Sequence, residues 1–126
     1  MNIPKDLKYT KEHEWVRIDG NVATVGITDF AQGELGDIVY VDVEVDDDSL
    51  LKGESFGSIE AVKTVSELFM PVTGVVTEFN EELEDSAGII NSAPYEKGWI
   101  IKIKMEDTSE VKSLLSAEEY ETMLNS

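Results

Sequence analysis

Short runs of β-branched and aromatic residues, separated by clusters of Gly, Asp, Asn and Ser, make up most of this chain. Such runs are typical of strands, and such clusters of turns, because branched and aromatic side chains pack well on a pleated surface. Asp19-Gly20-Asn21 is a strong hairpin signal, since Asp and Gly tolerate the positive φ of tight turns. The pattern predicts a β-sandwich or barrel. The expected strands are residues 14–18, 21–27, 38–45, 55–61, 65–70, 74–79 and 99–105.

One of these runs, residues 38–45, alternates regularly between two faces. Valines occupy every second position from Val39 to Val45, and the positions between them are mixed to acidic. We therefore expect a half-buried strand with a valine face toward the core.

Helical signals are confined to three short segments. Residues 28–35 predict a short helix that ends at Gly36. Residues 111–115 place their apolar side chains on one helical face. Ser116 and Glu119 have the spacing of a capping box, which predicts a C-terminal helix.

The length and composition of the chain limit the functions that it can have. Its 126 residues suit one domain, residues 1–126. The formal charge of −17 disfavours nucleic acid and anionic membranes as partners, because both are polyanions. Cysteine is absent, so thiol chemistry requires an attached group. No segment approaches the ~18 apolar residues of a membrane span and no targeting segment is visible, which predicts a cytoplasmic protein.

The stretch from residue 56 to residue 70 is too long for one strand and loses its alternation near Val62 and Lys63. Folding the chain back at this point gives two strands of ordinary length, with Lys63 at the tip of a hairpin. No Gly, Asn or Asp marks the turn, but a type I turn accepts these two residues. The sequence therefore predicts an exposed lysine.

Two interpretations of this lysine follow from its position. Schiff-base chemistry requires a deprotonated amine, and the flanking carboxylates of Glu60 and Glu67 favour the charged form. What is left is either an ordinary surface lysine or one that another enzyme modifies. Spacing alone does not separate these two interpretations.

Four blocks of sequence carry a resemblance to a known family. The chain resembles the H-protein family of the glycine cleavage system, whose members are lipoyl carriers. The blocks are YTKEHEWV at 9–16, NVATVGITDFAQGELGDIVYV at 21–41, GSIEAVKTVSELFMPVTGVV at 57–76 and GIINSAPYEKGWIIKI at 88–103.

The resemblance implies a mainly β fold, the lipoyl/biotinyl-type flattened β-barrel, also called a barrel-sandwich hybrid, with short flanking helices that include a C-terminal helical segment. It implies that Lys63 is the N6-lipoyllysine, with lipoate amide-linked to its side chain, and that the protein is a carrier without catalytic residues. Glu60, three residues before this lysine, is the candidate for recognition by the lipoylating enzyme.

The family also implies a set of partners. Glycine decarboxylase transfers an aminomethyl group from glycine to the lipoyl arm, aminomethyltransferase passes the one-carbon unit to tetrahydrofolate, and dihydrolipoyl dehydrogenase reoxidises the arm. A carrier that visits these enzymes is most simply a monomer. The loaded arm is expected to fold into a cleft on the carrier, where carboxylates hold its ammonium group. The candidate cleft residues are Glu12, Glu14, Glu34, Leu35 and Glu67.

Some residues depart from the family pattern or fit a different function. Ala61 replaces the usual serine near the lysine and moves the motif toward that of biotinyl carriers, whose flanking methionines are absent. An exposed lysine would also suit a scaffold from which lipoate is relayed to 2-oxoacid dehydrogenases, or an interaction module that stays unmodified. Asp46-Asp47-Asp48 lacks the spaced ligands of an EF-hand, so a solvated turn is preferred over calcium binding. His13 alone makes neither a metal site nor a catalytic pair.

Overall fold

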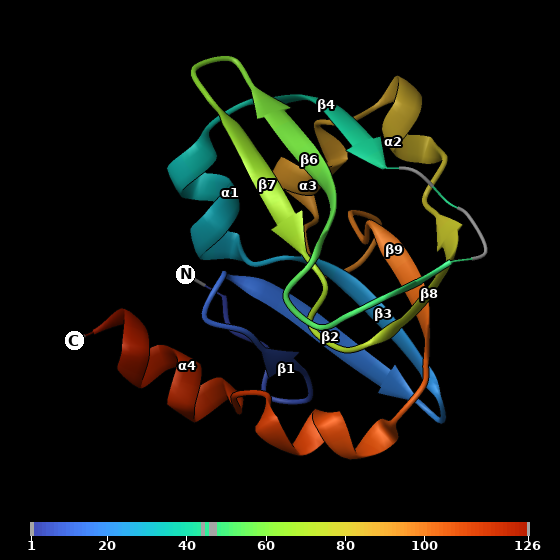
Figure 1. Cartoon of the computed structure of the whole chain (residues 1–126). Helices are drawn as coiled ribbons and strands as arrows, with labels where there is room; N and C mark the ends of the chain where they lie inside the picture. Colours follow the sequence, from blue (N-terminus) through green and yellow to red (C-terminus); the bar gives the residue numbers. More distant parts are fainter. Residues whose placement is uncertain (1, 44, 46–47, 126) are drawn as a thin grey trace.

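The computed structural model consists of two antiparallel sheets, and it describes residues 2–43, 45 and 48–125 (Figure 1). The order in the larger sheet is β1-β2-β3-β9-β8-β5, and in the smaller sheet it is β4-β6-β7. The larger sheet contains β1 (Lys8–Tyr9), β2 (Glu14–Asp19), β3 (Val22–Ile27), β9 (Ile101–Met105), β8 (Gly74–Phe79) and β5 (Ser49–Leu50). The smaller sheet contains β4 (Ile38–Val43), β6 (Ser55–Ala61) and β7 (Val65–Phe69).

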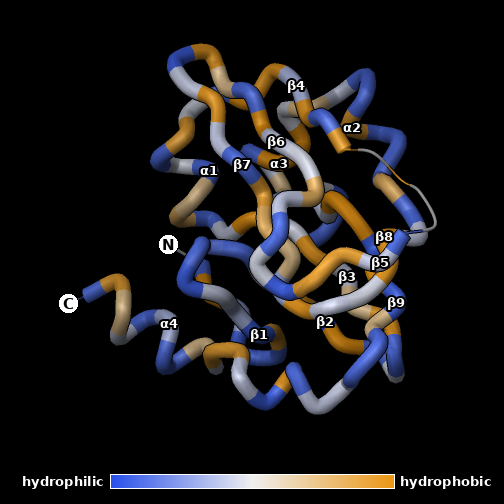
Figure 2. The backbone as a smooth tube through the Cα atoms, viewed as in Figure 1, coloured by the Kyte–Doolittle hydropathy of each residue, from blue (hydrophilic) through white to orange (hydrophobic). Residues whose placement is uncertain are grey.

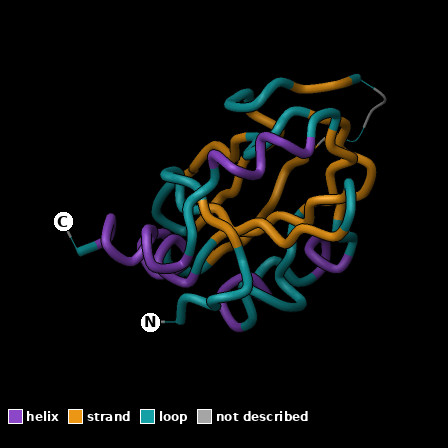
Figure 3. Tube along the Cα trace, turned by 90° about the horizontal axis from the view of Figure 1, so that it is seen from below, coloured by secondary structure: helices purple, strands orange, loops and turns teal. Residues whose placement is uncertain are grey.

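Short helices lie around the strands, as Figure 3 shows. They are α1 (Asp29–Leu35), α2 (Glu82–Asp85), α3 (Ile89–Ser92), the 3₁₀ helix η1 (Thr108–Ser113) and α4 (Ala117–Leu124). The mainly β prediction with short helices and a C-terminal helix is confirmed. Every predicted strand is present, with ends that differ by at most about two residues, which is the usual uncertainty of such boundaries.

Local capping explains where the two longest α-helices begin. The Thr28 side chain accepts a hydrogen bond from the Ala31 N–H at the start of α1. At α4 the predicted capping box is present, because Ser116 and Glu119 bond to each other's backbone N–H groups. Each cap satisfies backbone donors that a helix leaves free in its first turn.

The segment before α4 differs from its prediction. The helix expected over residues 111–115 is instead a 3₁₀ helix that begins earlier, at Thr108, with the Asp107 side chain accepting from the Ser109 N–H. Leu115 lies outside this helix because its N–H and C=O exchange two 2.8 Å hydrogen bonds with Tyr9. Pairing with β1 therefore overrides the local helical pattern.

The valine face expected for residues 38–45 is also partly wrong. A register shift between Ile38 and Tyr40 in the pairing of β4 with β6 interrupts the alternation. Ile38 and Val41 point into the core, whereas Val39 is exposed. A bulge of this kind turns one residue out of phase with its strand.

Apolar side chains from the two sheets form most of the core, and Val25, Ile59 and Ile103 are fully buried in it. A second cluster, which includes Tyr9, Trp15 and Tyr120, is formed where α4 packs against β1 at the edge of the larger sheet. The C-terminal helix is thus part of the fold. Within the described residues no helix is long and apolar enough to cross a membrane.

Candidate functional site

Lys63 lies at the tip of the β6–β7 hairpin, where the chain reverses between Ala61 and Val65 (Figure 1). The Ala61 N–H donates to the Thr64 carbonyl at 2.8 Å and closes the turn. The turn needs no glycine, because among the described non-glycine residues only His13 has a positive φ. The Lys63 side chain is exposed, as the broken alternation predicted.

The tip is also anchored to the end of α1. The Val62 N–H donates to the Asp37 carbonyl at 3.0 Å. A Cβ atom added at Gly36 would lie 3.5 Å from Cε of Lys63 and 3.9 Å from its Nζ. Gly36 ends α1 with a φ of 79°, which favours glycine. The amine end of the Lys63 side chain therefore lies beside the C-terminal end of α1.

Two exposed apolar side chains lie near the lysine at the surface. Val62 is 75 % exposed and Val65 is 63 % exposed. Glu60, which lies opposite Val65 in the β6–β7 ladder, is exposed as well. Figure 2 shows hydrophobic and hydrophilic segments side by side at this tip. These side chains are therefore available for contact with a partner that reaches Lys63.

A cavity of about 280 Å³ lies between α1 and β7, close to this tip. It brings together four of the predicted cleft residues, Glu12, Glu34, Leu35 and Glu67. Its other lining residues are His13, Ile27, Phe30, Ala31, Ile59, Ser66 and Leu68. The lining is therefore apolar with several carboxylates, and none of the described lining residues is Lys or Arg.

The imidazole of His13 also lines this cavity. Burial lowers its pKa below 6.5, and the carboxylates of Glu12 and Glu34 oppose this effect by favouring the imidazolium. The His13 ring packs on Phe30, with ring centroids 4.7 Å apart. The cavity therefore combines an imidazole of lowered basicity with exposed carboxylates.

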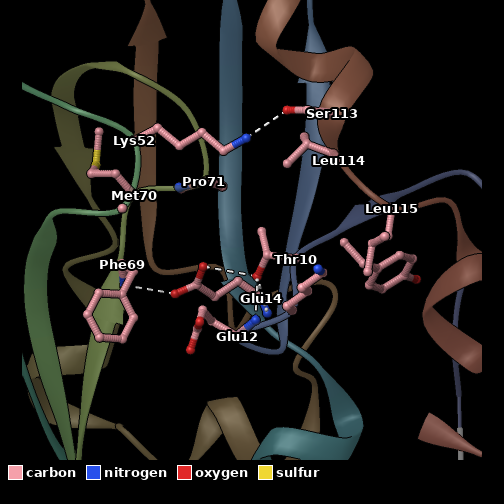
Figure 4. A pocket seen from close by; sticks show the side chains of 13 residues that line it. Thr10, Glu12, Glu14, Lys52, Phe69, Met70, Pro71, Ser113, Leu114 and Leu115 are labelled. Carbon is pink, nitrogen blue, oxygen red and sulfur yellow. Dashed lines mark hydrogen bonds between the residues drawn. The ribbon is translucent and has the colours of Figure 1, made fainter. Parts of the chain in front are cut away.

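Glu14 lies elsewhere, in a neighbouring cavity of about 470 Å³ that Figure 4 shows. Its carboxylate, only 2 % exposed, accepts hydrogen bonds from the Phe69 N–H at 2.8 Å and from the Thr10 hydroxyl at 3.2 Å. Burial raises the pKa of Glu14 to about 7. Lys52 lines the same cavity, but its Nζ donates to Ser113 Oγ at 2.7 Å.

Glu14 therefore connects β2 of the larger sheet to β7 of the smaller sheet. The structure does not place it with the other candidates, although Glu12 lines both cavities. Its position could not be foreseen, because the bond to Phe69 joins residues 55 positions apart.

Sequence reasoning missed several lining residues, among them Ile27, Phe30 and Ile59. One signal was available for Phe30, since it precedes Glu34 by four residues in the predicted helix and such residues share a face. Ile27 and Ile59 could only be assigned to the core, because strands far apart in the sequence bring them together.

The solvated turn expected at Asp46-Asp47-Asp48 falls largely on residues that the structure does not describe. Asp46 and Asp47, on which calcium binding would depend, lie outside the described residues. Within residues 2–43, 45 and 48–125, no group of His, Cys, Asp and Glu side chains has the arrangement of a metal site.

Comparison with known proteins gives consistent matches over nearly the whole chain. Residues 7–126 match the family model described as Glycine cleavage H-protein. The chain is 55 % identical over 124 residues to glycine cleavage system H proteins of Staphylococcus saprophyticus and Staphylococcus carnosus, covering 98 % of this chain and 98 % of each relative. A crystal structure of a glycine cleavage system H protein from Mycobacterium marinum superposes with a TM-score of 0.88 at 35 % identity, covering 98 % of this chain and 100 % of that one.

Proposed function

The chain belongs to the glycine cleavage H-protein family, and from this premise we propose that it carries lipoate on Lys63. It is a non-catalytic lipoyl carrier of the glycine cleavage system. The observation that carries the assignment of the lysine is its exposed position at a hairpin tip beside an apolar cavity lined by carboxylates.

The residues present fit a lipoyl group. Its aliphatic chain and ring are apolar, which suits contact with Leu35, Ile59 and Leu68. Amide formation would remove the lysine charge, so the arm could approach these side chains without burying an ammonium group. When bound, lipoate supplies a disulfide that the chain itself lacks, because the sequence contains no cysteine.

The chain's own side chains have separate tasks in this proposal. The apolar lining from α1 and β6 excludes water from the arm. Glu12, Glu34 and Glu67 supply carboxylates that pair with a protonated amine at the end of the arm. Glu14 is not needed for this contact, since its two oxygens already accept internal hydrogen bonds.

Membership of the glycine cleavage system implies glycine decarboxylase, aminomethyltransferase and dihydrolipoyl dehydrogenase as partners, together with a lipoylating enzyme. A tethered arm raises the effective concentration of its cargo at each of these enzymes. The exposed hairpin tip supports this role, because an enzyme can surround Lys63 without unfolding the carrier. A monomer is the simplest assembly for a protein that visits several partners.

Mass spectrometry after incubation with lipoate and a lipoate-protein ligase tests the attachment site. One added lipoyl group is expected, mapped to Lys63. Lys63→Arg should lose the modification while keeping its melting temperature, because exposed side chains contribute little packing energy. Lys112→Arg, another exposed lysine, is the matched control and should be modified like the wild type.

The outcome against this proposal is an unmodified wild-type protein in a reaction where a second lipoyl carrier is modified. Biotin at Lys63 in cells that make both cofactors would instead indicate a biotinyl carrier.

Glu60 is proposed to contribute to recognition by the lipoylating enzyme, because it is exposed and lies one residue from the turn. Glu60→Gln should slow lipoylation by roughly threefold, the effect of losing one exposed ion pair worth ~0.2–1 kcal/mol. The initial rate of lipoyl incorporation measures the effect. Glu81→Gln, an exposed residue before α2, serves as control, and equal rates for the two variants would exclude a specific role for Glu60.

A further inference from the structure

His13 lines the cavity between α1 and β7 with a backbone conformation that is rare for residues other than glycine. Its φ is 66°, the only positive φ among the described non-glycine residues. The backbone N–H of His13 donates to the Thr10 carbonyl at 3.2 Å, and the backbone carbonyl of His13 accepts from the Thr28 N–H at 3.1 Å. Strained backbone persists where the surrounding structure fixes it, and this happens frequently at functional sites.

The imidazole of His13 belongs to a chain of three polar side chains. Its Nδ1 lies 2.8 Å from the Tyr120 hydroxyl, and this hydroxyl lies 2.8 Å from Thr28 Oγ1. Thr28 and Tyr120 are both fully buried. Tyr120 comes from α4 and stacks on Tyr9 with ring centroids 4.8 Å apart. The C-terminal helix thus reaches the cavity through one hydroxyl group.

The direction of the hydrogen bonds follows from the buried threonine. Thr28 Oγ1 accepts a hydrogen bond from the Ala31 N–H. Within the described part of the chain, the acceptor available to the Thr28 hydroxyl hydrogen is the Tyr120 oxygen. A buried hydroxyl hydrogen without an acceptor is costly, so Thr28 donates to Tyr120. Tyr120 then donates to Nδ1 of His13. An imidazole nitrogen that accepts carries no proton, which leaves the neutral ring protonated at Nε2.

This neutral form matters because of the charges around it. Glu12, Glu34 and Glu67 line the same cavity, and carboxylates favour a charged imidazolium as their counter-ion. Burial acts in the opposite direction and lowers the pKa of His13. A charged His13 would compete with any external cation for these carboxylates.

We propose that the Thr28–Tyr120–His13 chain holds the imidazole neutral and so reserves the carboxylates of the cavity for a protonated amine, which the cavity takes in preference to an uncharged group of similar size. Tyr120 is a positioning residue in this arrangement, because it acts through His13. The inference rests on the proposed function for the source of the amine, the end of the arm on Lys63.

His13 is the single histidine of the chain, so ¹⁵N NMR of the unmodified protein observes it without ambiguity. At pH 7 the wild-type spectrum should show the neutral ring with its proton on Nε2. Tyr120→Phe removes one hydroxyl and keeps the ring that stacks on Tyr9. It should give a mixture of tautomers and a larger charged fraction near pH 6.5. A wild-type ring protonated at Nδ1 would overturn the proposal without any variant.

Titration with methylammonium chloride, followed by the NMR signals of Glu34 and Glu67, tests the consequence for binding. At pH 6.5 Tyr120→Phe should weaken methylammonium binding by about threefold, the effect of a competing charge at a partly exposed site. Acetamide, neutral and of similar size, should bind more weakly than methylammonium to the wild type.

The decisive comparison uses His13→Gln, in which residue 13 cannot become charged. In this background Tyr120→Phe should leave methylammonium binding unchanged. A threefold loss that persists without the histidine would show that Tyr120 acts only by supporting the fold, and it would overturn the proposal, as would equal binding of acetamide and methylammonium. These measurements need no lipoate, so their failure is distinguishable from a failure to lipoylate Lys63.

Discussion

Two charged residues of this protein have opposite environments. Lys63 stands at a hairpin tip with its side chain exposed to solvent. Glu14 has 2 % of its surface exposed, and its carboxylate accepts hydrogen bonds from Phe69 and Thr10. The first arrangement leaves a side chain available to other enzymes. The second joins two sheets and makes the stability of the fold sensitive to one proton.

The pKa of Glu14, raised by burial to about 7 from 4.5, predicts a pH dependence of stability. The folded state holds this proton more tightly than the unfolded chain does, so folding is favoured when the proton is bound. The penalty for ionising Glu14 is absent below about pH 4.5, grows as the pH rises to about 7 and is then constant. It amounts to roughly 3 kcal/mol at 1.36 kcal/mol per pKa unit.

Urea unfolding of the wild type and of Glu14→Gln between pH 4.5 and 8 measures this contribution. The glutamine keeps an oxygen that can accept from the Phe69 N–H but does not ionise. Relative to the wild type, the variant should gain stability as the pH rises. Glu12→Gln, an exposed neighbour, controls for general charge effects. Parallel pH profiles for the wild type and Glu14→Gln would contradict the prediction.

At the scale of the element, α1 and the β6–β7 hairpin together build the cavity. α1 contains no fully buried residue and supplies Phe30, Glu34 and Leu35 to the lining. The hairpin supplies Ile59 and Glu67. The helix is weakly formed by local propensity, since it has a glycine near its centre, whereas the hairpin is held in a ladder on both sides of β6.

Replacing a glycine by alanine should therefore change the stability of the protein in opposite directions at Gly33 and Gly57. A Cβ at Gly33 of α1 meets nothing within 4 Å, so Gly33→Ala should stabilise the protein by about 0.5–1 kcal/mol through helix propensity. A Cβ at Gly57 of β6 would overlap the Asp42 carbonyl, so Gly57→Ala should destabilise by roughly 2 kcal/mol or more. Urea midpoints of the two variants check both signs. A Gly57→Ala protein as stable as the wild type would show that β4 and β6 can separate without cost.

At the scale of the whole molecule, the two packed sheets carry a formal net charge of −17. The apolar core lies among side chains of both sheets, and Glu14 bridges them at one side. Like charges at the surface repel one another more strongly in the compact state than in the expanded unfolded chain. Burial of the apolar core therefore stabilises the folded state, and repulsion among the surface carboxylates destabilises it.

Added salt should screen this repulsion and stabilise the folded protein. Raising NaCl from ~0.01 M to ~0.1 M shortens the Debye length from about 30 Å to about 10 Å. A gain of ~1 kcal/mol would raise the melting temperature by roughly 3–5 °C for a domain of this size. Calorimetry at neutral pH measures the shift, with sucrose at matched osmolality as control. A melting temperature that is constant or falls with NaCl would show that surface repulsion is unimportant.

The sequence by itself determined the local features of this protein. The strands β2, β3, β4 and β6 to β9, the capping box at Ser116 and the exposed turn at Lys63 all follow from patterns within a few residues, because side-chain period, capping and turn formation are local interactions. The two-residue strands β1 and β5 were not predicted. The resemblance that was visible in four blocks of sequence gave the family, which the comparisons confirm.

Only the tertiary structure decided which of these residues meet. It brought Glu12, Glu34 and Glu67 into one cavity and placed Glu14 in another. It also joined His13 to Tyr120, 107 residues later in the chain. Contacts between distant segments depend on how sheets and helices pack, and no local pattern encodes that packing, so the cavity and its hydrogen-bond chain became visible only in the fold.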